Sequence, residues 1–172
     1  MHLLPHSLTH SLTHEVNNET ILKSLLADIR EVLLVLVNDV STNENSNYDH
    51  AAQLLLSSYV SFLCSRGLVH EGEVLLDTIY TSNQRGARCI AAPTVEYVMK
   101  KLAYEREGLR AVKWFHRLAH ISEGADHHTS SSLAYHHVCD ALRRSKDFDR
   151  LVSFIEDPFA TDGEKTSDVK SE

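Results

Sequence analysis

The sequence predicts an all-α protein, an α-solenoid of about three stacked helix–turn–helix hairpins with one helix in front of them. Apolar residues recur at steps of three and four along most of the chain, which is the period of an amphipathic helix. Only 3 Pro and 6 Gly interrupt the 172 residues, and this scarcity favours long helices. One hairpin pattern also returns at spacings of 39 and 40 residues. Because a single hairpin cannot bury both of its apolar stripes, we expect the copies to stack.

Residues 1–18 are interpreted as a low-complexity leader. Its histidines recur every four residues, and such a pair on a helix can chelate a metal, but accidental periodicity is the favoured interpretation. The histidines concerned are His2, His6, His10 and His14. An organelle transit peptide is an open alternative, because residues 1–14 lack acidic residues, although they also lack Arg.

A long helix is predicted over residues 19–40, where apolar residues recur from Ile21 to Val37. Residues 41–50 are rich in Ser, Thr, Asn and Asp, a composition typical of a linker. The hairpins occupy residues 51–158, and residues 159–172 form an acidic tail that we expect to be disordered.

The three predicted hairpins align without gaps. Each first helix carries apolar residues at offsets zero, three, four and seven, a turn residue at offset eleven, and a second helix that packs from offset sixteen. The apolar sets are Leu56, Tyr59, Val60, Leu63; Val95, Val98, Met99, Leu102; and Tyr135, Val138, Cys139, Leu142. The turn residues are Gly67, Arg106 and Lys146, and the residues at offset sixteen are Gly72, Ala111 and Leu151.

The connections between hairpins are predicted at Thr81–Ala92 and Ile121–Ser132, both as loops. Thr94, with Pro93 ahead of it, is predicted to cap the helix that follows the first loop. In the second helix of the first hairpin, Val74 is expected to face the core together with Leu75 and Leu76.

The charge is distributed unevenly. The net charge is −7, yet the hairpin region from Ala51 to Pro158 holds 13 basic and 13 acidic residues, so the acidic excess lies in the flanks. A balanced middle permits nucleic-acid binding without supplying a strong basic footprint. No apolar run reaches the roughly 18 residues of a membrane span, so no membrane association is expected.

Motifs of catalysis are not found: the chain has no Gly-rich phosphate loop, nucleophile elbow or HExxH. We therefore predict a non-enzymatic protein with no cofactor, no metal and no small-molecule substrate. A zinc site from His116, His120 and one of the later His pairs is the alternative, and loop or solvent-facing histidines are favoured over it. Cys64, Cys139, Trp114 and Phe115 are expected in the core, and an odd, sparse cysteine count suits a reducing compartment. Trp114 and Phe115 as a base-stacking platform are the alternative.

The hairpins resemble pentatricopeptide repeats, on the stretches from Ala134-Tyr135-His136 to Ile155-Glu156, CSRGLVHEGEVLLDTI and LAYEREGLRAVKWF. Tetratricopeptide and other helical-pair repeats share the apolar spacing and rank second. The resemblance implies single-stranded RNA as ligand, read by the residue after the Tyr-like position and by the last residue of each unit. The matching positions here are Ser57 with Ala91, Glu96 with Ser131, and His136.

Basic residues also gather at the far ends of two neighbouring first helices. Lys100 and Lys101 lie on one, Arg143 and Arg144 on the next, and Lys146 follows in the turn. Stacking would align them, with Arg106, into a ridge that contacts phosphate. The alternative is a solvated helix end that the helix dipole favours.

We therefore expect an RNA-associated protein in an organelle, as a part of a ribonucleoprotein such as the mitochondrial ribosome or of RNA processing. The mitochondrial location follows from the resemblance, with the cytoplasm as alternative. The alternative function is a protein–protein scaffold that binds no RNA. In either case a protein partner is expected to cover the last hairpin, because terminal repeats need polar caps.

Overall fold

The computed structural model describes residues 20–37, 46–82, 86–121 and 127–160, and these are helical with short connections and contain no strand. The helices are an N-terminal one over residues 20–37, α2 (Ser46–Ser65), α3 (Val69–Ser82), α4 (Ala92–Glu105), α5 (Gly108–Ile121), α6 (His127–Ser145) and α7 (Phe148–Glu156). A short 3-10 helix, η1 (Gly86–Cys89), lies between α3 and α4. The predicted all-α class is confirmed.

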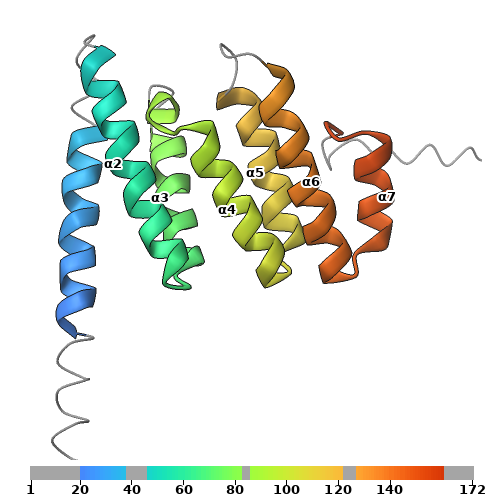
Figure 1. Ribbon diagram of the computed structural model, residues 1–172, viewed down its shortest axis with the longest axis horizontal. Helices are drawn as coiled ribbons and strands as arrows, with labels where there is room; N and C mark the ends of the chain where they lie inside the picture. Colours follow the sequence, from blue (N-terminus) through green and yellow to red (C-terminus); the bar gives the residue numbers. More distant parts are fainter. Residues whose placement is uncertain (1–19, 38–45, 83–85, 122–126, 161–172) are drawn as a thin grey trace, which may run out of the picture.

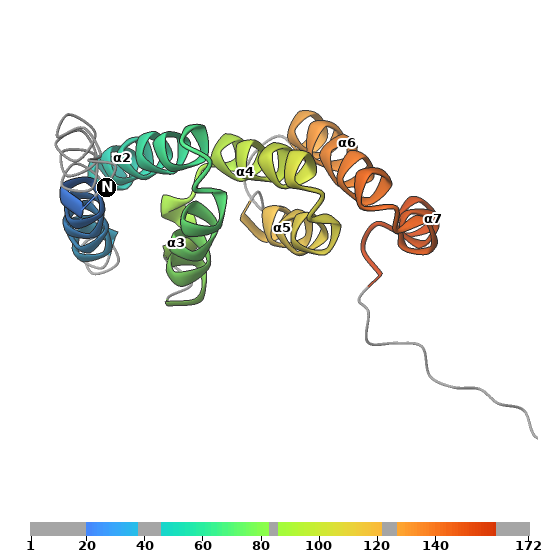
Figure 2. The same ribbon diagram turned by 90° about the horizontal axis from the view of Figure 1, so that it is seen from below.

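Neighbouring helices form antiparallel pairs that stand side by side (Figure 1). Figure 2 shows α2, α4 and α6 in one row and α3 and α5 in a second row, with the 20–37 helix and α7 at opposite ends. Contacts join α2 to α3, α4 to α5 and α6 to α7 within pairs, and α2 to α4 and α4 to α6 along the row.

The core runs through this arrangement as one cluster of buried apolar side chains. The residues predicted at offsets zero, three, four and seven supply much of it. Those of α2 and α4 are buried, and in α6 Val138 and Leu142 are buried while Tyr135 and Cys139 are half-buried. Trp114 and Phe115 are also buried, as predicted, and so is Cys64. The helical period therefore identified the packed faces.

The three turns have one geometry. Gly67, Arg106 and Lys146 adopt positive φ angles of 79°, 66° and 63°. In each turn the next amide donates to the carbonyl at offset seven, as in the 2.9 Å bond from Leu68 N to Leu63 O. The equivalent bonds run from Glu107 to Leu102 and from Asp147 to Leu142. This is the Schellman arrangement, which satisfies the last carbonyls of a helix. The predicted turn positions are confirmed.

A buried carboxylate joins the first two pairs, and the sequence did not single it out. Glu73 of α3 is only 6% exposed. Its Oε1 accepts a hydrogen bond from Trp114 Nε1 at 3.1 Å, and its Oε2 accepts one from Arg110 Nε at 2.6 Å. Val74, predicted to face the core, is instead 37% exposed, because the core side of this turn of α3 is taken by Glu73.

Two connections differ from their predictions. Residues 46–50 of the predicted linker are the first turn of α2, since Ser46, Asn47 and Asp49 are residue types that a helix N terminus accepts well. Residues 127–132 of the second predicted loop likewise belong to α6. The loop predicted at Thr81–Ala92 also contains η1, and α3 continues to Ser82.

Thr94 is not a helix cap. The N-cap residue of α4 is Ala91, and Pro93 lies in the first turn, where its missing amide hydrogen costs nothing. Thr94 is buried inside the helix, and its hydroxyl lies 2.7 Å from that of Ser57 on α2. The Pro93–Thr94 sequence is typical of a helix start. It carries no information on Ser57, the hydrogen-bonding partner of Thr94, which lies 37 residues away.

The start of the predicted tail has a defined position. Phe159 packs on Phe115 with ring centroids 5.4 Å apart, and Pro158 O accepts a 3.0 Å bond from His116 Nε2. Residues 159–160 are therefore ordered by an aromatic contact that the polar composition concealed. Residues 161–172, the 1–18 leader and its histidines lie outside the described residues. None of the helices described combines the length and the apolar character that a membrane span requires.

Candidate nucleic-acid interface

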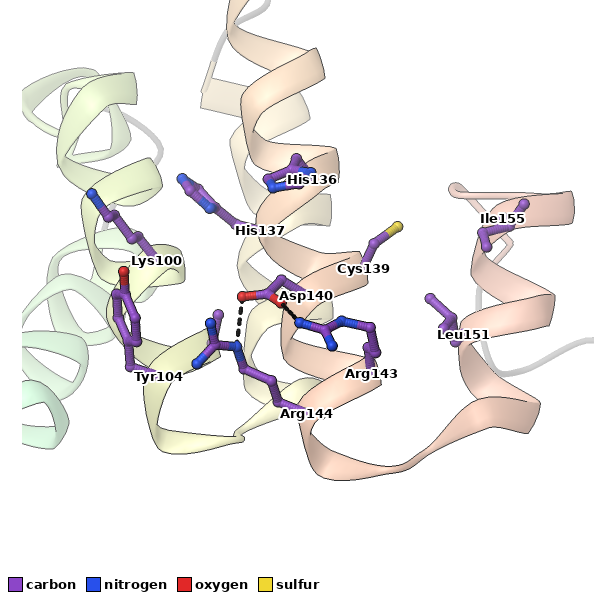
Figure 3. A pocket seen from close by; sticks show the side chains of 11 residues that line it. Lys100, Tyr104, His136, His137, Cys139, Asp140, Arg143, Arg144, Leu151 and Ile155 are labelled. Carbon is purple, nitrogen blue, oxygen red and sulfur yellow. Dashed lines mark hydrogen bonds and ion pairs between the residues drawn. The ribbon is translucent and has the colours of Figure 1, made fainter.

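A hollow of about 640 Å³ lies where α4, α6 and α7 meet (Figure 3). Its polar lining comes from two helices, with Lys100 and Tyr104 on α4 and the remaining groups on α6. The α6 residues are His136, His137, Asp140, Arg143 and Arg144. Ala103, Cys139 and two residues of α7, Leu151 and Ile155, complete the wall.

Helical geometry places these side chains together. Lys100 and Tyr104 are four residues apart and therefore share one face of α4, next to the buried Val98–Leu102 stripe. On α6, His136, Asp140 and Arg143 follow the same rule. Because α4 and α6 pack directly against each other, their polar faces meet at one hollow.

The charge of the hollow is partly neutralised from within. Asp140 accepts hydrogen bonds from Arg143 at 2.6 Å and from Arg144 at 2.7 Å, and Figure 3 draws both. Burial raises the pKa of the Asp140 carboxyl, but the bonds from these two guanidinium groups outweigh it and hold the pKa below its usual value. Asp140 is therefore ionised at neutral pH and fixes the orientation of both arginines.

An aromatic ring supports one of these arginines. The guanidinium carbon of Arg144 lies 5.0 Å from the centroid of the Tyr104 ring, which is cation–π distance. Tyr104 is 58% exposed, so most of its ring is open to solvent. Arginine with an adjacent exposed aromatic ring is a combination that binds phosphate and base in single-stranded nucleic acids.

The two histidines differ in environment. His136 is exposed, whereas His137 is half-buried. Burial, with help from His136 and Lys100, lowers the pKa of His137 below its usual 6.5. His137 is therefore neutral at pH 7 and can both donate and accept a hydrogen bond.

The structure brings together four of the residues predicted as RNA contacts. Lys100, His136, Arg143 and Arg144 all line the hollow. Lys146 lies outside it, in the left-handed turn between α6 and α7.

The other predicted contacts lie elsewhere. Lys101 points to a different side of α4, where its ammonium group is 5.3 Å from the Tyr97 ring centroid. Ser57 is engaged with Thr94 between α2 and α4, and Glu96 is half-buried on α4. Ala91 is half-buried at the start of α4, and the side chain of Ser131 is outside the described residues.

Tyr104, His137 and Asp140 belong to the hollow, although none of them was predicted as a contact. A signal was present for two of them. Tyr104 lies one helical turn after Lys100, and Asp140 precedes Arg143 and Arg144 by three and four residues, the spacing of helical ion pairs. His137 carried no such signal, because its half-buried position depends on the packing of α4 against α6.

His116 and Cys64 belong to residue types that serve in metal or redox chemistry, but their surroundings favour a structural role. His116 lies against the Pro158 carbonyl, and no cluster of three or more metal-ligand side chains occurs within the described ranges. Burial raises the pKa of the Cys64 thiol to about 11, which disfavours the reactive thiolate.

Comparison of this chain with protein-family models, with curated proteins and with solved structures finds no match.

Proposed function

We propose that this chain is a short α-solenoid of pentatricopeptide-like repeats that associates with single-stranded RNA, as a non-catalytic part of a ribonucleoprotein. The observation that carries the proposal is the hollow between α4, α6 and α7. It gathers three cationic side chains, an exposed aromatic ring and two histidines on the first helices of neighbouring hairpins.

The repeated hairpins support the solenoid part of this proposal. Three turns with the same hydrogen bonds occur at positions 67, 106 and 146, and the first helices of the hairpins form one row (Figure 2). In a helical-repeat RNA binder such a row presents successive side chains to successive nucleotides. The mitochondrial location is proposed from the resemblance alone.

The expected binding mode is electrostatic and weakly selective. Lys100, Arg143 and Arg144 contact phosphate, and the Tyr104 ring stacks on a base. Ser57 and Glu96 do not line this hollow, so base-by-base reading along the row is not part of the proposal.

The test is binding of the full chain to random-sequence single-stranded RNA, followed by fluorescence anisotropy across a salt series. We expect Lys100→Gln, Arg143→Gln and Arg144→Gln, combined in one variant, to weaken binding at low salt by more than tenfold. Removing three phosphate contacts should also reduce the slope of log affinity against log salt by about 2.

A matched control is Lys113→Gln on α5, in the other row, which should leave both affinity and slope nearly unchanged. Asp140→Asn should act in the opposite direction and tighten binding several-fold, because both arginines lose their internal counterion. No affinity, an affinity indifferent to salt, or an equal loss in the Lys113 control would refute the RNA proposal.

A scaffold that binds protein without RNA is the second candidate, and a specific observation favours it. Apolar side chains are exposed on the outer faces of the 20–37 helix and of α7, at the two ends of the row. If the RNA test fails while these faces bind a partner, the scaffold function replaces the first proposal.

A further inference from the structure

The last helix described, α7, exposes a face that its counterparts bury. The offsets are counted, as above, from Leu56, Val95 and Tyr135 in the three hairpins. Offsets thirteen, seventeen and twenty then fall on Phe148, Val152 and Ile155 in α7. Their exposed fractions are 57%, 54% and 54%. The three residues lie at spacings of four and three and therefore form one stripe along the helix.

The same positions are covered in the two preceding hairpins. In α3 they are Val69, Glu73 and Leu76, with exposed fractions of 3%, 6% and 0%. In α5 they are Gly108 and Phe115, both buried, with a half-buried Val112 between them.

Residues of the next hairpin contribute to this cover. Glu73 of α3 contacts Arg110 and Trp114 of α5, and Phe115 of α5 contacts Tyr135 of α6. Helices of the next hairpin also pack on the second helix of the preceding pair, as α4 does on α3 and α6 on α5. The stripe of α7 is thus the contact surface for a further helix of the same kind.

The opposite end of the row has a complementary feature. The 20–37 helix uses one face to pack on α2, where Leu33 and Val37 are buried and Tyr59 donates a 2.6 Å hydrogen bond to the Leu26 carbonyl. A second face is apolar and open to solvent. Its residues are Leu25, Ile29 and Val32, with exposed fractions of 53%, 36% and 60%, whereas Leu22 lines a hollow shared with α2 and α3.

This second face has the spacing of a helix-packing seam. The steps from Leu25 to Val32 are four and three, which is the period of residues that interlock with another helix. A helix that is apolar on two faces normally lies between two neighbours. Here the neighbour on one side is α2, and Figures 1 and 2 show no described helix on the other side.

We propose that two copies of this chain join head to tail, with the outer face of the 20–37 helix of one copy packed on the α7 stripe of the other. The joint repeats the contact that α4 makes with α3 and α6 with α5. It continues the row of helices across two molecules, and it does not depend on RNA binding.

The seams have similar lengths. Leu25 to Val32 and Phe148 to Ile155 each span seven residues, or about 10 Å of helix. Because the two faces are different surfaces, the contact is heterologous, and each joined pair leaves one free face at either end. The size of the assembly should therefore rise with protein concentration.

The test measures the mass of the full chain by light scattering over a range of concentrations. The wild-type protein should exceed the 19.4 kDa of one chain as concentration rises. Leu25→Glu blocks the first face and Val152→Glu blocks the second, and each variant alone should stay monomeric. Both residues are more than half exposed, so the charge should leave the fold intact, which circular dichroism checks.

The deciding sample is an equimolar mixture of the two variants. Each variant retains the face that the other has lost, so the mixture should form a one-to-one dimer of twice the single-chain mass and grow no further. Leu109→Glu on α5, equally exposed but away from both ends, is the control and should assemble like the wild type.

Each other outcome refutes the proposal. A wild-type protein that remains monomeric shows that no second copy covers these faces. A dimer of Val152→Glu alone shows that the 20–37 helices pair with each other, and a dimer of Leu25→Glu alone shows the same for α7. Val32→Glu and Phe148→Glu, at residues that are also more than half exposed, replace Leu25→Glu and Val152→Glu if either first variant fails to fold.

Discussion

Three single residues set the direction in which each hairpin returns. Gly67, Arg106 and Lys146 occupy the left-handed backbone region, where a side chain crowds the following carbonyl. Only Gly67 meets this requirement without strain. The other two turns form nevertheless, because the Schellman hydrogen bonds and the packing of the paired helices outweigh a cost of roughly 1 kcal/mol each.

This difference predicts opposite effects of two substitutions. A Cβ at Gly67 would have no atom within 4 Å, so Gly67→Ala changes only the backbone preference and should lower the free energy of unfolding by about 1 kcal/mol. Lys146→Gly relieves the same strain and should raise it by up to about 1 kcal/mol. Urea denaturation measures both values, and equal signs would contradict the assignment of strain to these turns.

At the scale of the helix, the distance between two packed helices depends on the size of the residue at their contact, and two such residues here are glycines. Gly108 begins α5 where α6 passes over it, and a Cβ there would lie 2.9 Å from Leu142 Cδ2 and 3.3 Å from Leu142 Cα. Gly72 of α3 has more space, because a Cβ added to it would lie 3.5 Å from its nearest neighbour, Cys64 Sγ. The two pairs of helices therefore tolerate side chains differently.

The space around each glycine predicts how a Gly→Ala substitution changes the free energy of unfolding. Gly108→Ala should lower the free energy of unfolding by about 1–2 kcal/mol, because α5 and α6 must move apart. Gly72→Ala makes ordinary contacts and gains helix propensity, so it should be neutral or stabilising by up to about 1 kcal/mol. Thermal and urea unfolding of both variants checks this, and a larger loss at Gly72 than at Gly108 would show that the packing is different.

The helices and turns could be predicted from the sequence because their causes are local. The period of apolar residues marks the buried faces, and offset eleven marks the turn even where Arg106 or Lys146 replaces glycine. Features with distant causes could not be predicted. Thr94 is directed by Ser57 of the preceding hairpin, and Glu73 is buried by Trp114 and an arginine of the following one.

The candidate site was predictable only in part, for the same reason. The alignment of the hairpins brought Lys100 and Arg143 to neighbouring helix ends, and the structure places both at one hollow. The direction of each side chain around its helix decides the rest. Lys101 is one position from Lys100 and lies over Tyr97 instead, so adjacent basic residues do not form one ridge.

For the whole molecule, each helix packs against its immediate neighbours along the row. The middle of the row is covered on both sides, and Val95, Val98, Met99 and Leu102 of α4 are each 0% exposed. The end helices are covered on one side. Helix 20–37 and α7 both place apolar residues in solvent, so they contribute less buried area per residue.

The decrease in burial from the middle of the row to its two ends predicts the pattern of amide hydrogen exchange. In dilute solution the amides of α4 and of the second half of α6 should exchange slowest. Those of the 20–37 helix and α7 should exchange at least about tenfold faster, because an end helix can open without disturbing the remaining pairs.

Raising the protein concentration should slow exchange in both end helices and leave α4 unchanged, since the head-to-tail joint covers the two ends together. The Val152→Glu variant should keep the difference in exchange rate between the middle and the end helices but lose its dependence on concentration. Uniform exchange along the chain would show that the helices unfold as one unit rather than from the ends of the row.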